Sequence, residues 1–95
     1  MKENIFYLNG RKIRSLNSFG KELRNTFYFE EHLNLKNLNV INDVLRGGYG
    51  ILAYNEVFTL IWQKYKTSER FLDKELLEFI LEILNENSNI TLIFE

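Results

Sequence analysis

Residues 57–62 have the sequence VFTLIW, and this run of β-branched and aromatic residues predicts the central strand of a sheet. Two further apolar runs lie near the ends of the chain, at residues 5–8 and 90–94. An Asn-Gly turn follows the first run, and a polar turn precedes the last. All three runs are nearly continuous in apolar residues, which is typical of strands in a sheet that is largely covered.

Helical periodicity follows the first strand. Phe19, Leu23 and Phe27 recur every four residues, so we expect a first helix there, with Asn17 or Ser18 as its N-cap.

Two more helices are expected between the second and third strands, a short one at residues 65–70 and a longer one at residues 72–85. The longer helix has a wide apolar face: Leu76, Leu77, Phe79, Ile80, Ile83 and Leu84. Strands separated by helices pair in parallel through right-handed crossovers. The sequence therefore predicts a small α/β fold with a three-stranded parallel sheet packed with helices.

Residues 37–48, NLNVINDVLRGG, predict a short helix with a sharp end. Asn37 is a favourable N-cap, and Gly47 suits the position just past the helix C-terminus. The apolar residues fall on one face: Leu38, Ile41, Val44 and Leu45. The polar residues fall on the other: Asn39, Asn42, Asp43 and Arg46. This polar face, whose only acid is Asp43, is where we expect function.

Length and composition set the class of protein. Ninety-five residues predict one domain, residues 1–95, and 45% hydrophobic with 15% aromatic residues is typical of a folded chain. The chain has no cysteine, which excludes disulfides and thiolate metal sites. No nucleophile–base pair, metal cluster or cofactor motif is visible, so we expect neither an enzyme nor a cofactor or metal. The N-terminal apolar run is too short for a signal peptide or a membrane span, which predicts a cytoplasmic protein without a membrane partner.

Charge is distributed unevenly along the chain. Residues 1–28 carry six Lys or Arg against two Glu, whereas residues 29–95 carry six against eleven Asp or Glu. The acidic part argues weakly for a cationic partner and against nucleic acid, and ordinary surface solvation is the favoured explanation. The basic cluster Arg11, Lys12 and Arg14 has no interleaved aromatic residues, so we expect no direct contact with nucleic acid.

Several other candidates have simpler interpretations. Four carboxylates form a column on the last helix: Glu75, Glu78, Glu82 and Glu86. They form a patch for a basic protein, or a solvated face, or a column neutralised by the basic N-terminal segment. The GGYG run at residues 47–50 lacks the Gly-Lys-Ser/Thr of a phosphate loop, so we interpret it as a flexible loop in which Tyr49 contacts a partner. Trp62 is expected in the core, and His32 has no catalytic partner.

Four segments, taken in order, resemble the barstar family, the intracellular inhibitors of small bacterial ribonucleases. NGRKIRS at residues 9–15 is similar to the family's NGxxIRS turn. Residues 37–47 are similar to its pattern N-L-D, three residues, D-x-L-x-G. LIW at residues 60–62 is similar to the family's second strand with its tryptophan, and ITLIFE at residues 90–95 to its closing strand.

The resemblance implies a two-layer fold and an inhibitor, monomeric when free, that occludes the active site of a basic ribonuclease with helix 37–46 and the adjoining loops. Carboxylates then replace RNA phosphates against the enzyme's cations, because a rigid carboxylate accepts paired hydrogen bonds from guanidinium. The resemblance places the family's most important aspartate at Asp43 and a flanking carboxylate at Glu82. The implied partner-binding residues are Asp43, Asn39, Asn42, Arg46, Gly47, Asn37, Tyr49 and Glu82.

Three positions depart from the family pattern. Asn39 occupies a position where the well-studied member has aspartate, and Lys36 and Arg46 add positive charge beside the expected acidic surface. These departures imply a different ribonuclease as the target. An alternative is an adaptor or regulatory module of the same fold that binds a non-nuclease protein through the same helix.

Overall fold

The predicted central strand forms at Phe58–Gln63 (β2) in a computed structural model that describes residues 4–95. It pairs in parallel with Ile5–Asn9 (β1) on one side and with Ile90–Phe94 (β3) on the other. The strand order is therefore β1-β2-β3, with Leu60 aligned between Phe6 and Leu92. The prediction of a three-stranded parallel sheet is confirmed.

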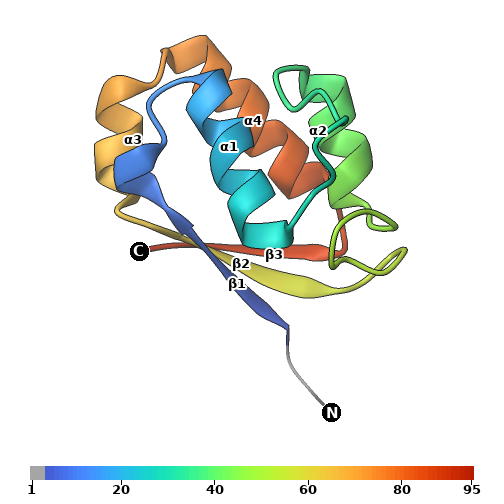
Figure 1. Ribbon diagram of the computed structural model, residues 1–95. Helices are drawn as coiled ribbons and strands as arrows, with labels where there is room; N and C mark the ends of the chain where they lie inside the picture. Colours follow the sequence, from blue (N-terminus) through green and yellow to red (C-terminus); the bar gives the residue numbers. More distant parts are fainter. Residues whose placement is uncertain (1–3) are drawn as a thin grey trace.

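All the α-helices lie on one side of the sheet (Figure 1). A short 3₁₀-helix and four α-helices connect the strands: Gly10–Lys12 (η1), Leu16–Phe27 (α1), Leu38–Leu45 (α2), Tyr65–Phe71 (α3) and Lys74–Glu86 (α4). The two crossovers run in the same direction across the sheet and have the same hand, so every helix is placed on the same face. The result is the predicted two-layer fold.

The expectation of a largely covered sheet is wrong for the second face. Strand side chains alternate, so Leu8, Leu60 and Trp62 are fully buried under the helices. On the opposite face Tyr7 is 50% exposed and Ile93 42% exposed. The apolar runs misled the prediction because isoleucine and tyrosine also occupy the outward positions.

The first helix begins earlier than its periodicity indicated. Ser15, not Asn17 or Ser18, is the N-cap of α1, and its hydroxyl accepts from the Ser18 N–H at 3.1 Å. The Ser18 hydroxyl accepts in return from the Ser15 N–H at 2.9 Å, which completes a capping box. From this start α1 buries Phe19, whose ring is stacked on Trp62 at 5.8 Å.

A buried hydrogen-bond chain joins η1, β2 and α3. The Trp62 indole donates to the Ser68 hydroxyl at 2.9 Å, and that hydroxyl donates to the Gly10 carbonyl at 2.7 Å. A Cβ at Gly10 would lie 2.3 Å from the Gln63 carbonyl oxygen, so only glycine permits this approach. The chain satisfies buried polar groups and fixes η1 against the end of β2.

The last helix has a narrower buried stripe than predicted. Leu77, Ile80 and Leu84 are buried, but Phe79 is 55% exposed because it lies outside the stripe that faces the sheet. Within residues 4–95 no helix is both long and apolar enough to cross a bilayer.

Within the basic N-terminal segment, η1 packs mainly on α3. Arg14 of this segment lies over the Phe71 ring of α3, with its guanidinium carbon 4.2 Å from the ring centre. Lys2 and Glu3, which belong to the same segment, lie outside the described residues.

Candidate functional site

The start of α2 is fixed by the predicted N-cap. The Asn37 side-chain oxygen accepts hydrogen bonds from the Asn39 N–H at 2.8 Å and from the Val40 N–H at 3.3 Å. These bonds satisfy two of the amide groups that a helix leaves unpaired at its N-terminus. The prediction that Asn37 caps the helix is confirmed.

The end of α2 is fixed by glycine. Gly47 has a φ of +102°, and its N–H donates to the Val44 carbonyl at 3.1 Å. A Cβ at this position would lie 2.0 Å from the Ala53 carbonyl oxygen. The loop beyond Gly47 is held as well, since the Asn55 N–H donates to the Arg46 carbonyl at 2.9 Å. Both ends of the helix are therefore held by specific contacts.

The two faces of α2 divide as predicted. Ile41, Val44 and Leu45 are buried in the core, with exposed fractions of 1% or less. The outer face is exposed: Asn39, Asp43 and Arg46. Asn39 and Asp43 are one turn apart, so their side chains are neighbours on the surface of the helix.

The inner side of the polar face borders a groove between α2 and α4. The Asn87 amide nitrogen donates to the Asn42 side-chain oxygen at 2.8 Å and to the Ile83 carbonyl at 2.7 Å, which joins the two helices. Beside this link lies a groove of about 690 Å³. Four of the predicted site residues line it: Asn37, Asn39, Asn42 and Glu82. The structure therefore brings Glu82 of α4 together with the amide side chains of α2.

The other four predicted residues do not line this groove. Asp43 and Arg46 belong to the exposed outer face of α2, and Gly47 is buried where it ends the helix. Tyr49 is 37% exposed and pairs with Leu52 in a short antiparallel bridge. The candidate surface thus has three parts: the groove, the outer face of α2 and the loop that follows.

The loop after α2 is packed, in contrast to the interpretation of a flexible segment. The Gly48 N–H donates to the Leu52 carbonyl at 2.8 Å, and the Ile51 N–H donates to the carbonyl of Phe27 at 2.9 Å. A Cβ at Gly50 would lie 2.2 Å from that same Phe27 oxygen. The glycines thus permit close contact with the end of α1.

Sequence reasoning missed Phe79, which lines the groove, and Asn87, which joins α4 to α2 beside it. Phe79 presents its ring to the groove, and the signal for this was its offset from the stripe of Leu77, Ile80 and Leu84. Asn87 is 7% exposed, yet in the sequence it belongs to a polar turn, so nothing indicated its bond to a residue 45 positions earlier.

The groove has mixed charge. Glu82 and Glu86 line it from α4, and Lys36 lines it from the loop before α2. His32 lies apart, exposed in another depression with Lys21 and Arg24. Within residues 4–95 no three His, Asp or Glu side chains gather closely enough to hold a metal ion. The groups at the surface can accept and donate hydrogen bonds, so the arrangement is suited to binding.

The chain was also compared with known proteins. A family model described as Barstar (barnase inhibitor) matches residues 3–91. A search of curated proteins found no match.

Proposed function

Because this chain belongs to the barstar family, we propose that it is an inhibitor that binds a small basic ribonuclease and occludes its active site. The surface that would enter the active site is α2 with its adjoining loops. The family is one of inhibitors, so the proposed role depends on binding and requires no chemistry by this chain.

The observation that carries the proposal is the position of Asp43. This carboxylate is exposed on a helix that Asn37 fixes at one end and Gly47 at the other. A carboxylate held rigidly loses little freedom when it accepts paired hydrogen bonds from a guanidinium group. Asn39, one turn earlier, adds a second hydrogen-bonding group without a second charge.

The groove supports the same role. Glu82 and Glu86 project from α4 beside α2, so cations around a ribonuclease active site would meet carboxylates on two helices. Opposite charges at these positions would also accelerate the encounter of the two proteins.

The proposal is tested by calorimetric titration against a panel of small cationic ribonucleases, together with an RNA-cleavage assay. We expect one-to-one binding that abolishes cleavage. Asp43→Ala should weaken binding about tenfold or more, since a hydrogen bond to a charged group contributes about 1.5–3 kcal/mol. Glu69→Ala is the matched control, because it removes an exposed carboxylate of α3 and changes the net charge equally.

An affinity of Asp43→Ala within about 0.5 kcal/mol of the wild type would show that this residue is not the anchor. A complementary variant, Asn39→Asp, adds the missing carboxylate and should tighten binding to a cationic site. Asn25→Asp makes the same charge change at an exposed position of α1 and should not tighten binding. Recovery of only non-nuclease partners from a native lysate would overturn the ribonuclease target and favour the adaptor.

A further inference from the structure

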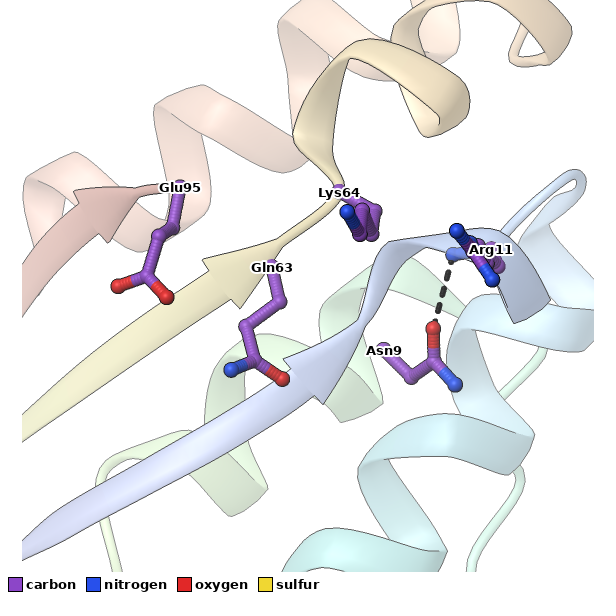
Figure 2. A pocket seen from close by; sticks show the side chains of 5 residues that line it. All are labelled: Asn9, Arg11, Gln63, Lys64 and Glu95. Carbon is purple, nitrogen blue, oxygen red and sulfur yellow. Dashed lines mark hydrogen bonds between the residues drawn. The ribbon is translucent and has the colours of Figure 1, made fainter.

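A second candidate site lies at the opposite end of the sheet from α2, beside α3 (Figures 1 and 2). The carboxyl ends of the three parallel strands meet there at a pocket of about 500 Å³. Five residues line it, from the strand ends, from η1 and from the start of the β2–α3 connection: Asn9, Arg11, Gln63, Lys64 and Glu95. This volume is in the range of sites that bind small molecules.

The pocket is rich in cationic and amide donors. Arg11 and Lys64 supply two positive charges, and Gln63 supplies an amide. The Asn9 side-chain oxygen already accepts from the Arg11 N–H at 3.1 Å, which leaves the Asn9 amide nitrogen as a further donor. Figure 2 shows the carboxylate of Glu95 pointing away from the two cationic side chains. Such a set of donors matches an oxyanion.

The backbone conformation of Lys64 is a second, separate indication of a functional site. Its φ of +54° and ψ of +38° lie in the left-handed region, which costs an ordinary residue about 1–2 kcal/mol. Glycine or asparagine would adopt this conformation more readily, so the turn itself does not account for a lysine. Strain of this kind concentrates at functional sites.

The walls of the pocket are rigid. Ser68 holds the Gly10 carbonyl at 2.7 Å and is itself held by the buried Trp62 indole. Gly10 precedes Arg11, and its close contact with the carbonyls of Gln63 and Lys64 fixes η1 against the end of β2. The two cations therefore project from a preorganised frame, which lowers the entropy lost on binding.

An aromatic ring lies on the bare face next to the pocket. Tyr7 precedes Asn9 by two residues on β1, so both side chains point to the same face, about 7 Å apart along the strand. Tyr7 is 50% exposed and is aligned with Ile61 of β2. The basic cluster of η1 thus has an aromatic neighbour, supplied by the preceding strand. Sequence analysis missed it because the aromatic is not interleaved with the basic residues.

We propose that this edge of the sheet binds a nucleotide, with a phosphate at Arg11 and Lys64 and the base against Tyr7. Proteins bind single-stranded nucleic acid with two elements: cations that hold the phosphates and aromatic rings that stack on the bases. The nucleotide is either free or part of a single strand. The site uses no residue of the α2 surface, so it does not depend on the inhibitor role.

The test is an NMR titration of the ¹⁵N-labelled full chain with inorganic phosphate, uridine 5′-monophosphate and a short oligouridylate. We expect amide shifts centred on Asn9 and Gln63, and tighter binding of the nucleotide than of phosphate. Oligouridylate binding more tightly than the mononucleotide would identify a strand as the source, whereas equal binding would identify a free nucleotide. Absence of shifts with millimolar nucleotide would overturn the site.

Variants separate the phosphate contact from the base contact. Lys64→Gly should weaken nucleotide binding about tenfold or more, while its backbone becomes easier to form, so lost binding does not reflect unfolding. Lys36→Gly removes a positive charge from an exposed loop outside the pocket and is the matched control. Equal weakening by both variants would show non-specific attraction and overturn the proposal.

The base contact has its own variant. Tyr7→Leu keeps an apolar side chain but removes the ring, so it should weaken binding of the nucleotide and leave binding of inorganic phosphate unchanged. If inorganic phosphate and the nucleotide bind the wild-type chain with equal affinity, the proposed role of Tyr7 is overturned.

Discussion

Substitution of two adjacent glycines provides a quantitative test of how α2 is fixed. Gly47 and Gly48 both have positive φ values, +102° and +86°, so alanine is strained at either position. The surroundings differ, because a Cβ at Gly47 would lie 2.0 Å from the Ala53 carbonyl oxygen, whereas a Cβ at Gly48 would meet no atom within 4 Å. The pair therefore separates backbone strain from steric overlap.

The expected losses follow from these two terms. Gly48→Ala should lower the free energy of unfolding by about 1–2 kcal/mol, the cost of a left-handed backbone. Gly47→Ala carries a similar strain and adds an overpacking term of about 1–3 kcal/mol, for a total of about 2–5 kcal/mol. A free energy of unfolding of about 5–15 kcal/mol is usual for small domains, so Gly47→Ala should still fold but with measurably lower stability.

Urea denaturation followed by tryptophan fluorescence measures the difference. Trp62 is the only tryptophan and is fully buried in the core, so its emission reports unfolding. If the two variants lose the same free energy within about 0.5 kcal/mol, the contact between Gly47 and Ala53 does not restrict the loop as argued. For the comparison to hold, the free energy of unfolding must depend on urea concentration with the same slope in both variants.

Three further variants test other parts of the structure. Ser68→Ala leaves the buried Trp62 N–H unpaired, whereas the Gly10 carbonyl keeps its bond from the Ile13 N–H. The variant should therefore cost about 1–3 kcal/mol in urea denaturation, and a loss below about 0.5 kcal/mol would contradict the buried chain. Burial and the nearby Glu69 carboxylate raise the pKa of Tyr65. The contribution of Tyr65 to the free energy of unfolding is therefore present below about pH 10 and should be lost as pH rises through the folded pKa. Tyr65→Phe should remove this decline in thermal unfolding, and exposed Tyr54→Phe should not. Asn37→Ala should cost about 1 kcal/mol and Asn37→Asp much less, measured by thermal unfolding.

Local patterns in the sequence were sufficient to predict most of the fold. The run at residues 57–62 places β2 within one residue, and Asn37 and Gly47 mark the ends of α2 because caps depend on neighbouring residues alone. The bare face of the sheet was not predicted. Its outward residues, among them Tyr7 and Ile93, are as apolar as buried ones, so composition does not distinguish the two faces.

The candidate site was predicted only in part, because its geometry depends on contacts between distant segments. Periodicity was sufficient to place Asn39 and Asp43 on the polar face of α2. The groove requires α4 to lie beside α2, and the bond between Asn42 and Asn87 that joins them has no local signal.

The separation between the two faces of α2 has a consequence for how such a protein can change over evolutionary time. The residues that hold the helix in place are its caps and its buried side chains, whereas Asn39, Asp43 and Arg46 are exposed. Under the proposed binding role, substitutions at these three positions would therefore alter recognition with little effect on folding. A lineage could follow a drifting target by changing this outer face alone, while the rest of the chain stays under selection for folding.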